Sequence, residues 1–177
     1  MLENKPSVSN QVISLAPFLN TNCKLVIKRE DLIHPYISGN KYRKLKYNLI
    51  NAKKEGFNTL LTFGGAYSNH IAAVASVGKE FGFNTIGVIR GEELIDKIDF
   101  NPTLLFAKEC GMKFLFISRK DYQLKTEKAF IDILKSKFGL FYLIPEGGTN
   151  QFAVKGCSEI LEKEDLNYDF ICASVGT

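Results

Sequence analysis

The residues best suited to chemistry lie in three short segments, and the first of these is SGNKYRKL (38–45). It places Lys41 one step inside a helix start, where the partial positive charge of the backbone disfavours a cation. Nearby positive charge lowers the pKa of a lysine, which helps the amine lose its proton and form a Schiff base with a carbonyl compound. The alternative is that Lys41 is an ordinary solvent-exposed cation of a basic helix.

The other two segments, TFGGAYSNHIAAVAS (62–76) and IPEGGTN (144–150), place glycines directly after an apolar run. In the first of them, Ser68, Asn69 and His70 stand at the mouth of the next helix, whose unpaired N–H groups suit a carboxylate or phosphate. Ser68 could equally be a simple helix cap, and His70 a surface or capping histidine. Because both turns follow strands of α/β units, they are expected at the same edge of a parallel sheet.

The elements that must position these segments alternate between short apolar runs and helical patterns. Strands are predicted at residues 25–28, 59–63, 85–89, 113–117, 141–144 and 170–173. Helices are predicted at residues 40–55, 68–81, 102–110, 125–138 and 152–163. The first four helices end at a glycine, and residues 91–100 are predicted to form an irregular surface loop. This βαβα order predicts a parallel α/β sheet with helices on both faces.

The composition, with 45% hydrophobic and 24% charged residues, is typical of a globular protein. The net charge of +4 helps to attract small anions but is far from the basic excess of a nucleic-acid binder. The lack of a long apolar run and of a secretory signal pattern predicts no membrane partner and a cytoplasmic location. The cysteines and histidines are not spaced as metal ligands, so no metal site is predicted.

Five segments together resemble the pyridoxal-phosphate-dependent family of 1-aminocyclopropane-1-carboxylate deaminase and D-cysteine desulfhydrase, which is part of the group that includes the tryptophan synthase β-chain. They are KREDL (28–32), SGNKYRKL (38–45), GGAYSNH (64–70), IPEGGTN (144–150) and ASVGT (173–177), in family order. The resemblance implies a two-lobed α/β enzyme with the cofactor between the lobes. Residues 1–44 and 145–177 would belong to the large lobe, and residues 45–144 would form the small lobe.

The resemblance also implies roles for individual residues. Lys41 matches the lysine that holds pyridoxal 5′-phosphate covalently and later moves protons. Asn69 matches the residue that hydrogen-bonds the phenolic oxygen of the cofactor, and Ser68 matches the serine that meets the substrate carboxylate and takes part in proton transfer. Gly176 and Thr177 match the beginning of the phosphate-binding loop.

The expected substrate is a small amino acid, whose carboxylate would bind at the helix mouth formed by Ser68, Asn69 and His70. The histidine at position 70 favours D-cysteine as the expected substrate, because SNH is more typical of desulfhydrase-like members of the family than of the deaminases. Elimination or ring opening, followed by hydrolysis, would release ammonia and a 2-oxo acid. Family members usually pair, which implies a homodimer.

Family members continue well past the position of Thr177, so the large lobe is expected to be incomplete and these 177 residues alone to be inactive. Apolar residues of that lobe, such as Phe170, Ile171 and Val175, are then expected to be exposed. Two other functions remain open. A non-catalytic α/β binding domain for an anionic metabolite would use the same glycine turns without needing Lys41. A nucleic-acid binder would use the basic helix 41–54, but the modest net charge argues against it.

Overall fold

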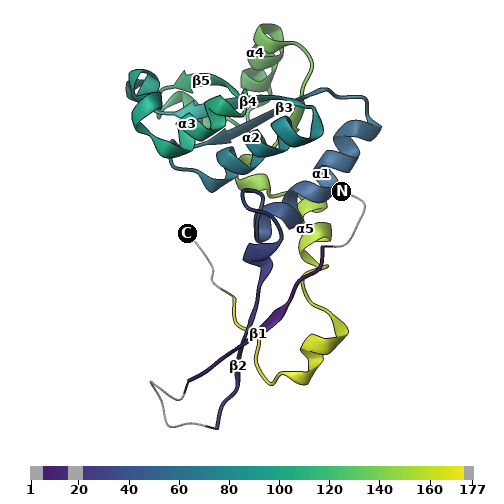
Figure 1. Cartoon of the computed structure of the whole chain (residues 1–177). Coiled ribbons are helices and arrows are strands. Elements are labelled where there is room, and N and C mark those ends of the chain that lie inside the picture. The colour runs from purple at the N-terminus through teal and green to yellow at the C-terminus, as the bar shows by residue number, and fades with distance from the viewer. Residues whose placement is uncertain (1–5, 16–21, 174–177) are drawn as a thin grey trace.

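A computed structural model describes residues 6–15 and 22–173 of the chain. Figure 1 shows a sheet covered by helices, from which a long two-stranded hairpin extends away. Among these described residues, no helix is both long enough and apolar enough to cross a membrane.

The sheet has four parallel strands in the order β5-β4-β3-β6. The strands are β3 (Thr59–Gly64), β4 (Asn84–Arg90), β5 (Lys113–Ile117) and β6 (Tyr142–Ile144). Leu60 of β3 lies opposite Thr85 of β4 and Tyr142 of β6. The chain therefore winds from β3 outwards to β5 and then returns to the other side of β3, so that the direction of winding reverses between β3 and β6.

Helices cover both faces of this sheet (Figure 1). They are α1 (Asn40–Lys54), α2 (Asn69–Phe81), α3 (Pro102–Glu109) and α4 (Lys128–Phe138), whereas a fifth helix, α5 (Gln151–Cys157), packs on α1. Leu60 of β3 belongs to a core that includes side chains of α1, α2 and α3. Its neighbour Leu61 points to the opposite face and joins a second core with Leu134 of α4. This alternation is the period-2 pattern of a strand buried on both faces, and the predicted parallel α/β sheet is confirmed.

The segments that join these elements contain several short 3-10 helices. They are η1 (Glu30–Leu32), η2 (Glu92–Phe100), η3 (Asp121–Leu124), η4 (Glu146–Gly148) and η5 (Lys163–Asn167). The prediction of an irregular loop at residues 91–100 is thus wrong in detail, because η2 occupies almost all of that segment.

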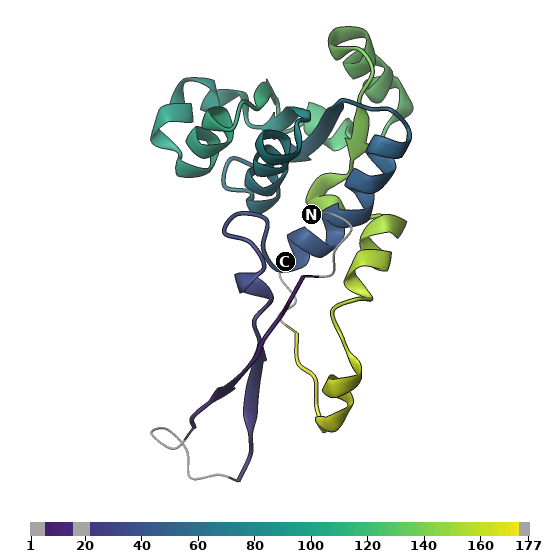
Figure 2. The same cartoon turned by 45° about the vertical axis from the view of Figure 1, so that its right-hand side comes forward.

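A two-stranded antiparallel hairpin, β1 (Asn10–Ile13) and β2 (Leu25–Lys28), lies apart from the sheet (Figure 2). Lys28 of β2 forms an ion pair with Asp165 of η5, at a distance of 2.8 Å between Nζ and Oδ2. The amide of Asn10 also donates to Asp165, at 3.4 Å. These two contacts connect the hairpin to the last described part of the chain.

Two predictions for the region after β6 are wrong. The helix at residues 152–163 ends early, because α5 stops at Cys157. Residues 170–173 do not form a strand, and Phe170 and Ile171 are 87% and 57% exposed. An apolar run becomes a strand only where another strand pairs with it, and within the described residues no strand pairs with this segment. The exposure of Phe170 and Ile171 was expected, whereas Val175 lies outside the described residues.

Helix α5 packs directly onto α1. A Cβ atom added to Gly156 of α5 would lie 1.8 Å from the backbone oxygen of Arg43 in α1. Glycine is therefore required at this position, since any side chain would push the two helices apart. The contact brings the segment that follows β6 against the helix that carries Lys41.

Candidate active site

The candidate active site lies at the carboxyl ends of β3 and β6, where the winding of the sheet reverses. Ligands of open α/β sheets bind at this kind of switch point. The segment that follows β3 leads to Ser68 and α2, and the segment that follows β6 leads through η4 to α5. Helix α1 contacts both α2 and η4, so all three of the segments singled out for their chemistry meet here.

Lys41 lies in the first turn of α1, beside a cavity of about 370 Å³. The cavity is lined by Pro35, Tyr36, Ser38, Gly39, Asn40, Lys41, Asn69 and Ala72. The amine of Lys41 donates a hydrogen bond to the side-chain oxygen of Asn40 at 2.9 Å. Burial lowers the pKa of Lys41 and the charge of Lys44 lowers it further, while the thiol of Cys157 acts in the opposite direction. The amine is thus more easily deprotonated than that of a free lysine, as Schiff-base chemistry requires.

Ser68 is the N-cap of α2, and its hydroxyl accepts a hydrogen bond from the N–H of Ile71 at 3.4 Å. A Cβ atom on Gly64 would lie 2.5 Å from Cγ1 of Ile71 and 3.0 Å from Oγ of Ser68. Gly64 therefore allows α2 to begin close against the end of β3. Asn69, the next residue, is exposed and lines the cavity with Lys41. The structure thus brings Lys41 and Asn69 together, and the catalytic role of Ser68 stays a prediction.

His70 is only 2% exposed and does not line the cavity. Its Nε2 lies 2.8 Å from the hydroxyl of Thr62, which itself donates to the carbonyl of Ile144 at 2.9 Å. Since the hydroxyl of Thr62 has one proton to donate, Nε2 of His70 must be the donor to it. Burial, with the charges of Lys41 and Lys44, lowers the pKa of His70 to about 3. His70 is therefore a neutral core residue.

The alternative of a surface or capping histidine is thus wrong, and the expected contact of His70 with a substrate stays a prediction for a side chain that does not line the cavity. The first turn of α2 passes over β3, which directs the imidazole towards Thr62. Sequence spacing alone does not reveal this direction.

The segment IPEGGTN (144–150) runs from the end of β6 through η4 to the start of α5, and it contacts α1 and α2 on the way. Gly148 has a φ of +76°, and a Cβ atom there would lie 3.2 Å from Cε1 of His70. Asn150 caps α5 by accepting from the N–H of Ala153 at 2.9 Å. Its amide also donates to the side-chain oxygen of the buried Asn48 in α1, at 2.7 Å. The glycines and the asparagine of this motif therefore have defined structural roles.

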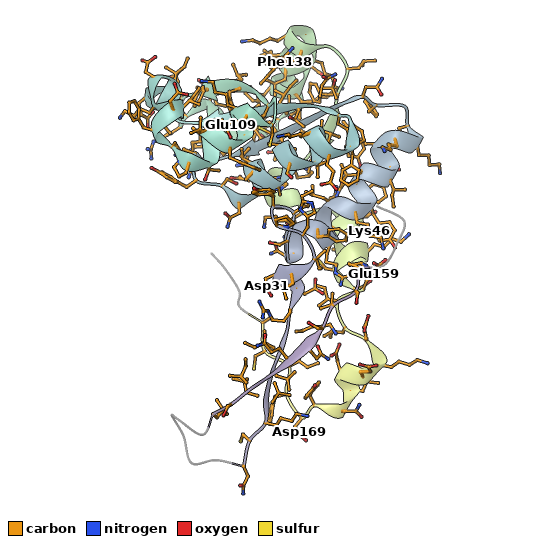
Figure 3. The ribbon with its side chains drawn as sticks, in the orientation of Figure 1. Asp31, Lys46, Glu109, Phe138, Glu159 and Asp169 are labelled. Carbon is orange, nitrogen blue, oxygen red and sulfur yellow. The ribbon has the colours of Figure 1, made fainter. Side chains whose placement is uncertain are left out.

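A buried ionic network holds α1 in place, and sequence reasoning missed it. The fully buried Arg43 donates from Nε and Nη2 to both oxygens of Glu30, at 2.9 Å and 2.7 Å. Glu159 accepts from Nζ of Lys46 at 2.7 Å and from the hydroxyl of Tyr47, and Figure 3 shows Lys46 and Glu159 next to each other. The signal in the sequence was Glu30, the first of the two acidic residues of KREDL, which is the partner of Arg43.

The predicted phosphate-loop residues, Gly176 and Thr177, lie outside the described residues. Their roles therefore stay predictions.

Comparison with known proteins gives relatives that share most of this chain, although no family model matches it. A Thermotoga maritima protein provisionally named 1-aminocyclopropane-1-carboxylate deaminase is 35% identical over 163 residues, which are 86% of this chain and 50% of that protein. The mitochondrial bifunctional D-cysteine desulfhydrase/1-aminocyclopropane-1-carboxylate deaminase of Arabidopsis thaliana is 31% identical over 181 residues, covering 91% of this chain and 45% of the relative. The crystal structure of a 1-aminocyclopropane-1-carboxylate deaminase homologue matches with a TM-score of 0.68 at 26% identity. That match covers 90% of this chain and 47% of the other. The chain therefore spans about half the length of the curated relatives it matches.

Proposed function

The chain is related by sequence and fold, over most of its length, to the family of 1-aminocyclopropane-1-carboxylate deaminases and D-cysteine desulfhydrases, and from this we propose that it carries the lysine-bearing part of a pyridoxal 5′-phosphate-dependent enzyme. The observation that carries the proposal is that Lys41, with its lowered pKa, and Asn69 line one cavity at the switch point of the sheet. The two residues are far apart in the sequence, and the family resemblance assigns both of them to the same cofactor.

The residues present fit this cofactor. A volume of about 370 Å³ lies within the range of roughly 300–1,000 Å³ that is usual for small-molecule pockets. Lys41 would hold the cofactor covalently, and Asn69 would hydrogen-bond its phenolic oxygen. Gly176 and Thr177 would begin the loop that binds its phosphate. When bound, pyridoxal 5′-phosphate supplies an electron sink that stabilises negative charge at the substrate α-carbon.

The protein's own groups would orient the substrate and move its protons. Asn40 accepts a hydrogen bond from the Lys41 amine and so restrains where that amine lies. Once released, the neutral amine would take up the α-proton if the substrate is D-cysteine, whereas 1-aminocyclopropane-1-carboxylate has no α-proton, so there the amine would move protons at the ring carbons instead. The first turn of α2 has N–H groups without helical partners, and with Ser68 and Asn69 these would bind the substrate carboxylate. The neutral His70 would act indirectly, by holding the start of α2 against β3 and β6.

The proposed substrate is a small amino acid, either D-cysteine or 1-aminocyclopropane-1-carboxylate; with water, both would give ammonia and a 2-oxo acid, and D-cysteine would also release its sulfur as hydrogen sulfide. We also propose a homodimeric, cytoplasmic protein in which residues 45–144 form the small lobe. Residues 1–44 and 145–177 would belong to the large lobe, and the 177 residues alone would have little or no activity.

The test is to trap the cofactor on the full-length protein. Pyridoxal 5′-phosphate is added, the adduct is reduced with borohydride, and the labelled peptide is found by mass spectrometry. The label is expected on Lys41 and should be lost in Lys41→Ala. Lys54→Ala is a matched control, because Lys54 is an exposed lysine in the last turn of the same helix and should leave labelling unchanged. A label elsewhere, with Lys41 unmodified, would refute the proposal. Retention of an anionic ligand by Lys41→Ala would support a binding domain instead.

A further inference from the structure

We propose that Tyr36 is a specificity-determining residue, because its ring forms an aromatic wall of the Lys41 cavity that limits the size of the amino acid able to reach Lys41. This inference rests on the proposed function and deepens it by assigning the size limit to one side chain. Neither the chemically suggestive motifs nor the family resemblance pointed to Tyr36.

Tyr36 is held in place by a second aromatic ring. It lines the cavity together with Lys41 and Asn69, and its ring stacks on that of Phe106 in α3. The two ring centroids are 4.5 Å apart and the rings are inclined by 29°. Stacked aromatic rings at this separation are mutually attractive, so Phe106 supports the wall. Although Tyr36 is 56% exposed, its ring is not free to swing away without losing this contact.

The backbone that carries Tyr36 is fixed by His34. Nδ1 of His34 accepts hydrogen bonds from the N–H groups of Tyr36 and Ile37, at 3.1 Å and 3.0 Å. Because Nδ1 is an acceptor, the ring proton of neutral His34 lies on Nε2, which is 2.9 Å from Oε2 of Glu80 in α2. Helix α2 also carries Asn69 at its opposite end. One imidazole thus ties the wall of the cavity to the helix that contributes another lining residue.

The size of the cavity explains why a wall at this point would select substrates. A volume of about 370 Å³ is near the lower end of the usual range for small-molecule pockets, roughly 300–1,000 Å³. With a cofactor bound to Lys41, an aromatic wall on a cavity of this size would favour a small amino acid over one with a branched side chain. Apolar walls of this kind discriminate by about 10- to 200-fold for each methylene group.

The ring, and not the hydroxyl, is the part of Tyr36 that matters here. Within residues 6–15 and 22–173, the Tyr36 hydroxyl makes no hydrogen bond. Tyr36→Phe should therefore keep the selectivity, whereas Tyr36→Ala should relax it. Tyr67→Ala serves as a matched control, because Tyr67 is an exposed tyrosine in the segment after β3 that does not line the cavity.

The experiment uses the full-length protein loaded with pyridoxal 5′-phosphate. D-alanine and D-leucine are titrated in, and the change in cofactor absorption gives an apparent Kd for each without requiring turnover. The wild type should bind D-alanine at least about 10-fold more tightly than D-leucine. Tyr36→Ala should reduce this ratio to about 3-fold or less, whereas Tyr36→Phe and Tyr67→Ala should not change it. Circular dichroism would verify that each variant is folded.

The outcomes separate the two proposals. If the wild type forms the Lys41 adduct but Tyr36→Ala keeps the wild-type ratio, the role of Tyr36 is overturned and the proposed function stands. If no adduct forms on Lys41 in the wild type, both are overturned. His34→Ala removes the acceptor of the Tyr36 and Ile37 N–H groups at a residue that does not line the cavity. Like Tyr36→Ala, it should lower the preference for D-alanine over D-leucine. An unchanged ratio in that variant would overturn the bracing role of His34.

Discussion

The buried pair between Glu30 and Arg43 gives the sharpest test of how α1, and with it Lys41, is held. Arg43 has a side chain that is 1% exposed, and its guanidinium binds both oxygens of Glu30. The change is Glu30→Ala, which removes this partner and leaves the buried cation with Glu159. The distance from Glu159 to Nη1 of Arg43 is 3.8 Å, so that its attraction offsets only part of the loss.

Removing one partner of a buried ion pair costs about 3–5 kcal/mol, and the remaining Glu159 places Glu30→Ala at the lower end, about 3 kcal/mol. The measurement is the free energy of unfolding from urea denaturation, followed by far-ultraviolet circular dichroism. The double variant Glu30→Ala, Arg43→Met removes the cation as well as its partner. The loss in free energy of unfolding for this double variant should be smaller, by about 1.5 kcal/mol or more, than the sum of the losses for the two single variants.

The matched control lies next to Glu30 in the sequence. Asp31 pairs with Arg29 at 2.7 Å, but the two side chains are 58% and 28% exposed. Because solvent screens this pair, Asp31→Ala should cost at most about 1 kcal/mol. The reasoning is refuted if Glu30→Ala costs no more than Asp31→Ala, or if the double-variant cycle shows no coupling.

Two further expectations concern the region around His70. Gly148→Ala should destabilise the protein by about 1–3 kcal/mol more than Gly82→Ala, because both glycines have φ near +75° but only the Cβ at position 148 meets the His70 ring. Equal costs in chemical denaturation would contradict that contact. The pKa of His70 is about 3 in the folded protein against 6.5 ordinarily, so below pH 6.5 the unfolded chain binds a proton that the folded protein does not. The free energy of unfolding should therefore fall as the pH falls from 6.5 towards 3, with a slope from this residue approaching about 1.4 kcal/mol per pH unit. Comparing wild type with His70→Gln between pH 6 and pH 4 isolates this slope, and identical slopes would show that His70 is not the group responsible.

Much of the sheet and of its helices could be read from local pattern. The strand predicted at residues 113–117 coincides with β5, and the helix predicted to end before Gly82 does so, with Gly82 at a φ of +73°. Buried parallel strands appear as apolar runs, and a glycine with positive φ ends a helix, so neither feature depends on distant residues. The hairpin strand Asn10–Ile13 was missed because its residues are largely exposed and it exists only by pairing with β2.

The candidate site also combines residues that the sequence indicated with residues that only the structure revealed. The family resemblance named Lys41 and Asn69, and the structure places both on one cavity. It did not indicate Tyr36, because that role depends on a stack with Phe106 of α3 and on the brace from His34. For a similar reason the direction of the His70 ring was not foreseen.

The sequence by itself determined the alternation of strands and helices, the glycine turns and the lysine at the helix mouth, because each depends on neighbouring residues. Only the tertiary structure decided which side chains meet. Asn48 binds Asn150, Lys46 binds Glu159, and Thr62 joins His70 to Ile144 across the sheet. The partners in the first two pairs are 102 and 113 residues apart, and such contacts follow from the packing of whole elements, which no local pattern records.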